Sequence, residues 1–430
     1  MLYDQAMLAM AYSEAFQATA NNQYRQTAEA VFAYVLRDLT APIGGFYSGE
    51  DADSEGVEGK FYLWREKEIQ EVLGEADAAL AKRFFCVETP GNYHDEATGR
   101  PTGMNILHLG KPPVAQAADS ASNQALGGRL EAIRAKLFAA RQQRVRPLKD
   151  DKILTDWNGL MIAALAKAGQ IFNNPAYTAA AGRAADFLLA QMRPAGGGLL
   201  HRYREGDRAI EAYLDDYAFL IWGLIELYES VFAEHYLAAA LALNEELIEL
   251  FWDDEAGGFF FTSTKGEELL VRRKEIYDGA IPSGNSVAML NLLRLGRLTG
   301  QARLEERAAR LSRAFAGEVR AMPSAYTQLL VAVEFGGGPS QEIVIAGEPA
   351  GADTRAMLQA LRQLYLPNKV VILHPAGSKG AAISRLAEFV AACTSINGQA
   401  TAYVCTNREC ALPTTDCQVM LELLTRTSVS

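Results

Sequence analysis

Residues 156–169 read DWNGLMIAALAKAG, and this stretch carries most of the evidence on architecture. It opens with Asp, Trp and Asn and is then apolar or small on every side. A helix that is apolar all round is buried inside a protein, and small residues such as Gly159 and Ala163 let helix backbones approach closely. The stretch therefore predicts an inner helix of a helical assembly.

The same pattern recurs in other segments, which makes it a repeat. They are YDQAMLAMAYSEAF (3–16), DDYAFLIWGLIELY (215–228), SGNSVAMLNLLRLG (283–296) and SAYTQLLVAVEF (324–335). Amphipathic segments follow several of them, at 22–39, 175–192, 233–251 and 301–319. Repeated hairpins of one buried and one half-exposed helix predict a mainly α fold built as a ring of helical pairs.

Gly-Gly turns followed by apolar or aromatic residues link the hairpins, at 44–46, 197–200 and 257–261. A charged stretch follows each turn, which predicts a β-hairpin inserted before the next inner helix. Residues 66–150 break the repeat, and we expect an amphipathic excursion with loops there.

The pattern changes after Gly336-Gly337-Gly338-Pro339. Strand-like and helix-like segments then alternate, which is typical of a small α/β domain with a partly parallel sheet. We therefore predict a toroid domain over residues 1–336 and a small α/β (βαβαβ) domain over residues 337–430.

The chain has 430 residues and a net charge of −11. This acidic balance argues against nucleic-acid and anionic membrane partners, which require basic surfaces. No apolar run approaches the length of a membrane span, and the five cysteines do not form a disulfide framework. These features predict a cytoplasmic protein. The chain begins directly in a core helix pattern, so we expect a fragment or late start of a longer product.

Residues 44–64, GGFYSGEDADSEGVEGKFYLW, contain a dense acidic loop. Its opening resembles an EF-hand calcium loop, but the twelfth position, which needs a bidentate Glu, is Tyr62. A solvated hairpin tip is the ordinary interpretation of such a charge run. We favour a third interpretation, in which one or two of Glu50, Asp51 and Asp53 face a pocket while Glu55 and Glu58 lie in solvent.

Polar residues begin the inner helices in matching register, at 156–158, 215–217 and 278–285. Helix capping explains part of this pattern. If the inner helices run parallel, however, these positions share one rim and line one concavity. The predicted catalytic residues are Asp51, Asp53, Asp215 and Asp216. The predicted substrate-binding residues are Trp157, Asn158, Tyr217, Tyr277, Asp278 and Asn285.

Histidine and cysteine spacings match no metal motif, and no cofactor motif is present, so we predict neither a metal nor a cofactor. His201 lies on a predicted hairpin that could reach the rim, although a single histidine is more often structural than catalytic. Reduced structural cysteines are the first expectation for the C-terminal segment, and a redox-labile Cys405–Cys410 pair is the second.

Several long segments together resemble the spermatogenesis-associated protein 20 family, whose bacterial members are labelled thioredoxin-domain-containing proteins. They are residues 44–64, 150–169, 213–229, 274–300 and 403–413. The resemblance implies an N-terminal thioredoxin-like domain followed by an (α/α)6 toroid like those of six-hairpin glycosidases and N-acylglucosamine 2-epimerases. It also implies that the thioredoxin-like domain and the first hairpin precede Met1. The sequence departs from the family at Asp156, where a serine is expected.

Toroids of this kind bind sugars at the inner rim, so the resemblance implies a carbohydrate-like ligand and carboxylate acid/base chemistry. The alternative is a non-catalytic module that works with a thioredoxin-like domain or another protein partner. A toroid short of one hairpin would leave an apolar seam, and we expect a homodimer or a domain swap to close it.

Overall fold

The computed structural model describes residues 1–95, 98–110, 120–194, 196–267 and 269–426. The chain divides into two compact units. Residues 1–49 and 151–430 form the larger unit, and residues 50–150 form the smaller one.

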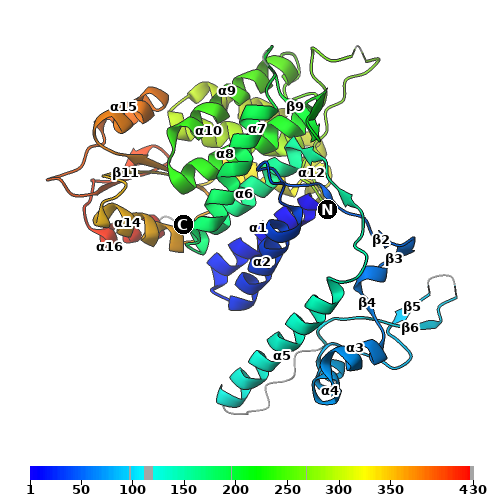
Figure 1. Ribbon diagram of the computed structural model, residues 1–430. Helices are drawn as coiled ribbons and strands as arrows, with labels where there is room; N and C mark the ends of the chain where they lie inside the picture. The colour runs from blue at the N-terminus through cyan, green and yellow to red at the C-terminus, as the bar shows by residue number, and fades with distance from the viewer. Residues whose placement is uncertain (96–97, 111–119, 195, 268, 427–430) are drawn as a thin grey trace. The chain divides into compact units, whose positions relative to one another are not determined.

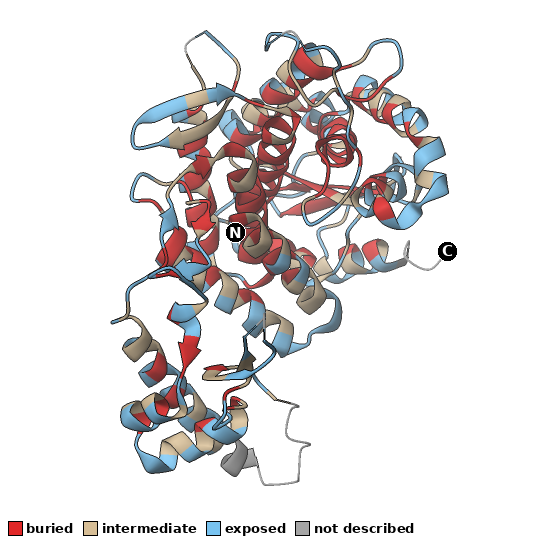
Figure 2. Ribbon diagram, turned by 90° about the vertical axis from the view of Figure 1, so that its right-hand side faces the viewer, coloured by how far each residue is buried: buried red, intermediate tan, exposed pale blue. Residues whose placement is uncertain are grey.

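Long helices form the inner layer of the larger unit (Figure 1). They are α1 (Leu2–Thr19), α6 (Thr155–Ile171), α8 (Leu214–Val231), α10 (Gly284–Thr299) and α13 (Thr327–Gly337). Each packs against the next in this order. Figure 2 shows α6, α8 and α10 buried over most of their length, as the all-round apolar pattern predicted.

An outer helix packs on each of the first four inner helices. These outer helices are α2 (Asn22–Tyr34), α7 (Pro175–Gln191), α9 (Glu234–Phe251) and α11 (Ala302–Ala314). The short helices Val35–Leu39, α12 (Ala316–Ala321) and Pro323–Ala325 complete the connections. The predicted toroid of helical hairpins is thereby confirmed.

Glycines allow α6 and α8 to cross closely. A Cβ on Gly159 would lie 2.5 Å from the carbonyl carbon of Phe219, and one on Gly223 would lie 2.7 Å from the Gly159 oxygen. Such separations are shorter than van der Waals contact, so any larger residue would push the two helices apart.

The turns between hairpins differ in their strand content. Strands β9 (Leu200–Arg204) and β10 (Asp207–Glu211) form the predicted hairpin, and β8 (Ile153–Leu154) pairs with β9. The turn at 257–261 makes one isolated bridge, between Trp252 and Phe259.

The smaller unit has its own apolar core, which includes Trp64, Ile69, Phe85, Ile133 and Leu137. Its helices are α3 (Glu66–Leu73), α4 (Glu75–Phe84) and α5 (Ser120–Arg141). Its strands are β2 (Asp53–Ser54), β3 (Val57–Glu58), β4 (Leu63–Trp64), β5 (Tyr93–His94) and β6 (Pro101–Ile106), and β1 (Gly49–Glu50) pairs with β7 (Lys149–Asp150) at its boundary. A short helix spans Lys60–Tyr62.

A partly parallel sheet follows α13. Its strands are β11 (Gln341–Ala346), β12 (Lys369–His374), β13 (Thr401–Thr406) and β14 (Glu409–Cys410), in the order β12-β11-β13-β14. β11 and β12 are parallel, and the other pairs are antiparallel. Helices α14 (Ala352–Gln363), α15 (Gly377–Leu386), Glu388–Ala392 and α16 (Cys417–Arg426) accompany it.

Strand alternation gives this sheet two buried faces. Val344, Val370 and Ile372 join the core of the toroid, whereas Ile343 and Leu373 join a second core with α14 and α16. The sheet therefore belongs to the same compact unit as the helices, although the predicted boundary at residues 336–337 falls just before β11.

Cys405 and Cys410 form a disulfide between β13 and β14. The expectation of reduced cysteines is therefore wrong for this pair, and its redox lability stays a prediction. The two residues face each other across an antiparallel pair, and Cys410 is exposed.

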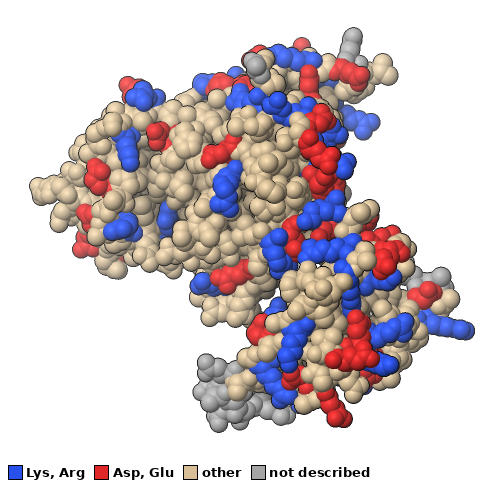
Figure 3. All heavy atoms as spheres, viewed as in Figure 1, with Lys and Arg blue, Asp and Glu red and all other residues tan. Residues whose placement is uncertain are grey.

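None of the described helices is long and apolar enough to cross a membrane. On the face shown in Figure 3, acidic and basic side chains are interspersed. That face lacks the continuous basic stripe that nucleic acids require.

Candidate functional site

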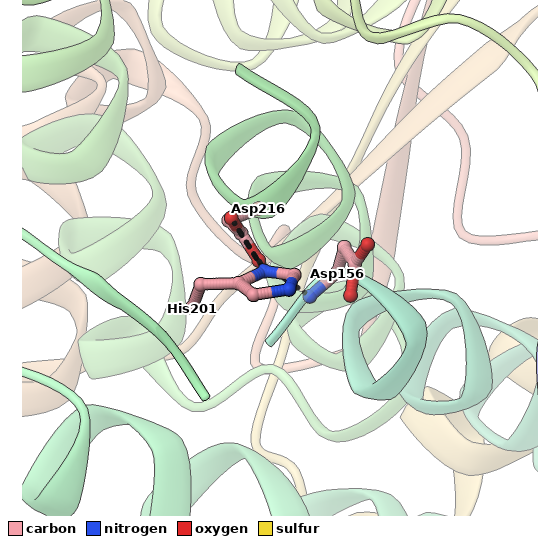
Figure 4. A group of neighbouring side chains, drawn as sticks. All are labelled: Asp156, His201 and Asp216. Atoms are coloured by element: carbon pink, nitrogen blue, oxygen red, sulfur yellow. Dashed lines mark hydrogen bonds and ion pairs between the residues drawn. The ribbon is translucent and has the colours of Figure 1, made fainter. Parts of the chain in front are cut away.

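A buried carboxylate, Asp216, lies at the centre of the candidate site. It occupies the first turn of α8 and is 1% exposed. Its Oδ1 accepts the backbone N–H of Asp156 at 3.0 Å, and its Oδ2 accepts that of Tyr213 at 2.8 Å. Nδ1 of His201 lies 2.9 and 3.0 Å from the two oxygens (Figure 4).

His201 reaches this position from β9. Pairing of β9 with β8, directly before α6, brings the hairpin to the N-terminal ends of α6 and α8. Burial lowers the pKa of His201, but the hydrogen bond and the charge of Asp216 outweigh it, so the pKa lies above its ordinary value. Nδ1–H donates to Asp216, and the other ring nitrogen lies toward Asp156 (Figure 4).

Asp156 lies on the other side of the cluster, in the first turn of α6. Its Oδ1 accepts the backbone N–H of Trp157 at 2.7 Å. Burial, together with the negative charge of Asp216, raises the pKa of Asp156 well above its usual range. Asp156, which stands where a serine was expected, therefore holds its proton more tightly than an exposed aspartate does.

Asp215 lies next to this group, toward α10. Burial raises its pKa to about 7, and the charges of Asp216 and Glu275 contribute. The Gly284 backbone N–H donates to Asp215. A Cβ on Gly284 would lie 2.3 Å from Oδ1 of Asp215, so glycine at the start of α10 permits this close approach.

The cluster contains the elements of acid/base catalysis. A general acid and a general base work best when their environments separate their pKa values around the working pH. Asp215, with a pKa near 7, can donate a proton at neutral pH. His201, oriented by Asp216, can accept one at its other nitrogen.

Asp156, His201 and Asp216 are also close enough to hold a metal ion, with ligand atoms within 4.8 Å of one another. Carboxylate and imidazole groups are common ligands of divalent cations. However, both oxygens of Asp216 already accept N–H groups. An ion bound between Nδ1 of His201 and Asp216 would displace the hydrogen bond that joins them, so the acid/base role is the one that uses the contacts present.

The amides expected to bind ligand hydroxyl groups are used internally. Asn158 and Asn285 are fully buried. Oδ1 of Asn158 accepts the N–H of Phe46, and its Nδ2 donates to the carbonyls of Phe46 and Leu154. Asn158 therefore has a structural role, because it holds the turn that follows Gly44-Gly45. Asn285 makes the matching hydrogen bonds to Phe259 and Glu275 and holds the turn at 257–261.

Tyr217 and Asp278 are likewise engaged within the protein. Tyr217 is 1% exposed. Its hydroxyl is hydrogen-bonded to the backbone of Leu199 and lies 3.4 Å from Oε2 of Glu246. Asp278 accepts the backbone N–H groups of Ser283, Gln328 and Leu329. It thereby caps the start of α13, whereas α10, the helix that residues 278–285 lead into, is capped by Ser283.

The aromatic residues at the rim keep accessible surface. Trp157 is half-buried, with its ring 4.9 Å from that of Tyr3. Tyr277 is 67% exposed. Of the predicted substrate-binding residues, these two retain surface that a ligand can contact.

Asp51 and Asp53 belong to the smaller unit and are exposed within it. Oδ1 of Asp51 lies 3.4 Å from the backbone nitrogen of Asp53. Their pairing with Asp215 or Asp216 stays a prediction. Glu55 and Glu58 are exposed, as expected, and Glu55 pairs with Lys60 at 2.8 Å.

Asp156 and His201 were not among the catalytic residues predicted from the sequence. The available signal was positional, because His201 lies on the hairpin that directly precedes the doubled aspartate. The structure brings Asp156, His201 and Asp216 together and adds Asp215 beside them.

The fold and the cluster define a helical toroid with a buried Asp–His group at the N-terminal ends of its inner helices. The chain is similar to human spermatogenesis-associated protein 20, with 35% identity over 450 residues that cover 97% of this chain and 56% of the human protein. The rat protein of the same name is 34% identical with the same coverage. The resemblance read from the sequence is thereby confirmed.

The chain spans about half the length of the curated relatives it matches. An uncharacterised protein of Caenorhabditis elegans is 30% identical over 86% of this chain and 54% of its own length. No protein-family model matches the chain.

Solved structures show lower similarity. A sugar epimerase from a ruminal bacterium is 10% identical, with a TM-score of 0.45 over 73% of this chain and 60% of the epimerase. A GH76 α-mannanase from Bacteroides thetaiotaomicron is 12% identical, with a TM-score of 0.42 over 74% of this chain and 61% of the mannanase.

Proposed function

We propose that the larger unit binds a carbohydrate-like small molecule and processes it by acid/base chemistry at the N-terminal ends of α6 and α8. The observation that carries this proposal is the contrast among adjacent carboxyl groups. Asp215 has a pKa of about 7, whereas Asp216 accepts three N–H donors that favour its charged form. Such a pair supplies a proton donor and a charged partner at neutral pH.

In this proposal, Asp215 donates a proton to the ligand. His201 accepts a proton at the ring nitrogen that faces Asp156, while Asp216 holds the ring orientation and stabilises the resulting cation. Trp157 and Tyr277 offer aromatic faces on which a sugar ring can stack. The resemblance to sugar-binding toroids supports a carbohydrate-like ligand.

A thermal-shift screen with monosaccharides and disaccharides, followed by a turnover assay on any sugar that binds, tests the proposal. We expect at least one sugar to stabilise the wild-type protein, and we expect Asp215→Asn and His201→Gln to lose its turnover. Asp254→Asn is the matched control, because Asp254 is exposed and lies outside the cluster. A sugar that is turned over equally by all variants would contradict the proposed roles.

The sequence also predicted Asp51 or Asp53 as the second carboxylate. Asp51→Asn and Asp53→Asn variants test this directly in the same assay. Loss of turnover in either variant, with retained binding, would assign the base or nucleophile to the smaller unit. Unchanged turnover in both would leave the reaction to the Asp–His cluster.

A non-catalytic interaction module is the second candidate function. It is favoured by one observation, namely that Asn158, Tyr217 and Asn285 at the rim are all buried and bonded within the protein. Under this alternative no sugar in the screen binds, and a thioredoxin-like domain or another protein is the partner.

We propose a cytoplasmic location on the basis of cysteine usage, because five cysteines in 430 residues are not the disulfide framework of a secreted protein. The Cys405–Cys410 disulfide weighs against it, because disulfides are uncommon in the reducing cytosol. Thiol trapping in intact cells separates the two cases: a mostly reduced pair fits the cytoplasm, and a fully oxidised pair contradicts it.

A further inference from the structure

A cavity of about 470 Å³ lies among the C-terminal halves of the inner helices. Its wall includes Lys167, eleven residues after Asp156 on α6, and Glu226, ten residues after Asp216 on α8. At about 1.5 Å per helical residue, these positions are roughly 15 Å from the Asp–His cluster along the helices. The cavity is therefore a separate site.

The cavity has an apolar surface on both sides. The inner helices contribute Met10, Trp222, Leu290 and Phe335, and α14 contributes Leu358 and Leu361. Its volume falls within the range of about 300–1,000 Å³ that small-molecule sites occupy, and such sites are mostly apolar with a few placed polar groups.

Three carboxylates of the wall, Glu14, Glu226 and Glu229, share two cations. Arg294 Nη1 lies 2.5 Å from Glu226 Oε1, and its Nη2 lies 2.9 Å from Glu229 Oε2. Lys167 pairs with Glu14. Burial raises the pKa of Glu226, but the charges of Arg294 and Lys167 outweigh it and hold the pKa at about 2. Apart from the exposed Glu334, a cationic ligand would meet only paired carboxylates here.

Two further cations in the wall, Arg362 and Lys369, form no direct ion pair with a carboxylate of the described residues. Arg362 of α14 donates to the Ser230 carbonyl at 2.7 Å, and Lys369 of β12 donates to the Leu366 carbonyl at 3.2 Å. Burial lowers the pKa of both groups, and at Lys369 the more distant charge of Glu229 partly opposes this effect. A buried cation without an anionic partner is costly, and an anion that fills the gap recovers that cost.

We propose that this cavity binds a small organic anion with an apolar body, such as an aromatic or medium-chain carboxylate or sulfonate. Arg362 and Lys369 act as its counter-ions, and Trp222 and its apolar neighbours contact its body. The site joins the toroid to the C-terminal sheet, so its occupant contacts both.

The probe for the test is 8-anilino-1-naphthalenesulfonate, an anion with an apolar body that fluoresces when bound. We expect saturable binding with one site per chain and displacement by hexanoate or benzoate. Arg362→Met and Lys369→Met should each weaken binding about tenfold, the size of one lost charge-assisted hydrogen bond. Arg355→Met and Lys379→Met are matched controls, since both residues are exposed, and should leave it unchanged.

A measurement on the wild-type protein covers the case in which a variant fails to fold. The uncharged analogue N-phenyl-1-naphthylamine has almost the same body, so it should bind at least tenfold more weakly than the sulfonate. Equal affinity for the two probes would overturn the proposal, as would binding that is unchanged in Arg362→Met and Lys369→Met. Absence of saturable binding would overturn it as well.

Discussion

Asn158 and Asn285 make the same three hydrogen bonds in two different repeats. Each side-chain oxygen accepts the N–H of a turn phenylalanine, at 2.7 Å from Phe46 and 2.8 Å from Phe259. Each side-chain nitrogen donates to the carbonyl of that phenylalanine and to one further carbonyl. Two repeats therefore share one attachment, which fixes α6 and α10 each to the turn before it.

Replacing Asn158 with alanine should lower the free energy of unfolding by ~3 kcal/mol, because buried backbone groups lose their partners. Urea denaturation measures the change. Asn22→Ala is the control, since Asn22 is exposed in the first turn of α2, and should change stability by less than about 0.5 kcal/mol. A small change for Asn158→Ala would show that the turn is held by other contacts.

Asp215→Asn should raise the melting temperature at pH 8 and leave it nearly unchanged at pH 4. The folded pKa of about 7 lies above the unfolded value near 3.9, so the unfolded chain ionises first and stability falls as the pH rises between these values. Asparagine removes this loss. Melting curves from pH 4 to 8 measure it, and a variant that is less stable than wild type at pH 8 would contradict the pKa.

The His201–Asp216 pair should likewise stabilise the protein less as the pH rises, but over a higher pH range than Asp215. The pKa of His201 is raised, so its stabilising effect is complete below about pH 6.5 and is lost as the pH rises through the folded value. His201→Gln should therefore cost more stability at pH 5.5 than at pH 9. Urea titrations at the two pH values compare the variant with wild type, and an equal cost at both would show that the imidazole is neutral throughout.

Arg294→Met should destabilise the protein by about 3–5 kcal/mol, because it leaves Glu226 and Glu229 as buried charges without their partner. Arg303→Met removes an exposed ion pair with Glu245 and should cost at most about 1 kcal/mol. Chemical denaturation compares the two. Similar costs would mean that water reaches the Arg294 network.

Metal removal should have no effect. Nδ1 of His201 is hydrogen-bonded to Asp216, so we expect the cluster to be stable without an ion and dialysis against EDTA to leave the melting temperature unchanged. Elemental analysis of the purified protein should find much less than one equivalent of zinc, manganese or iron. One equivalent, lost together with stability on EDTA treatment, would assign a metal to Asp156, His201 and Asp216.

The sequence predicted the inner helices well because burial on every side leaves a signal in every turn. It did not predict the separate unit at residues 50–150. Most of the strands in that unit are two residues long, too short for a period-2 pattern, and its core residues come from segments far apart in the chain.

The candidate site was predicted only in part. The doubled aspartate was a usable signal, and Asp215 and Asp216 do lie in the cluster. Asn158 and Asn285 were predicted to bind substrate, but both are bonded to turn backbones. A polar residue at the start of an inner helix gives the same sequence signal in either role. Only the three-dimensional path of the β9–β10 hairpin shows that His201 reaches Asp216.

Glu229 does more than balance Arg294. Its Oε1 accepts the N–H of Val371 at 3.1 Å, on the outer edge of β12, the last strand on that side of the sheet. An open strand edge can recruit a strand from another chain and start aggregation. A glutamate on α8 thus blocks the sheet from growing in that direction, and its loss should make the protein prone to self-association through β12 even where the fold survives.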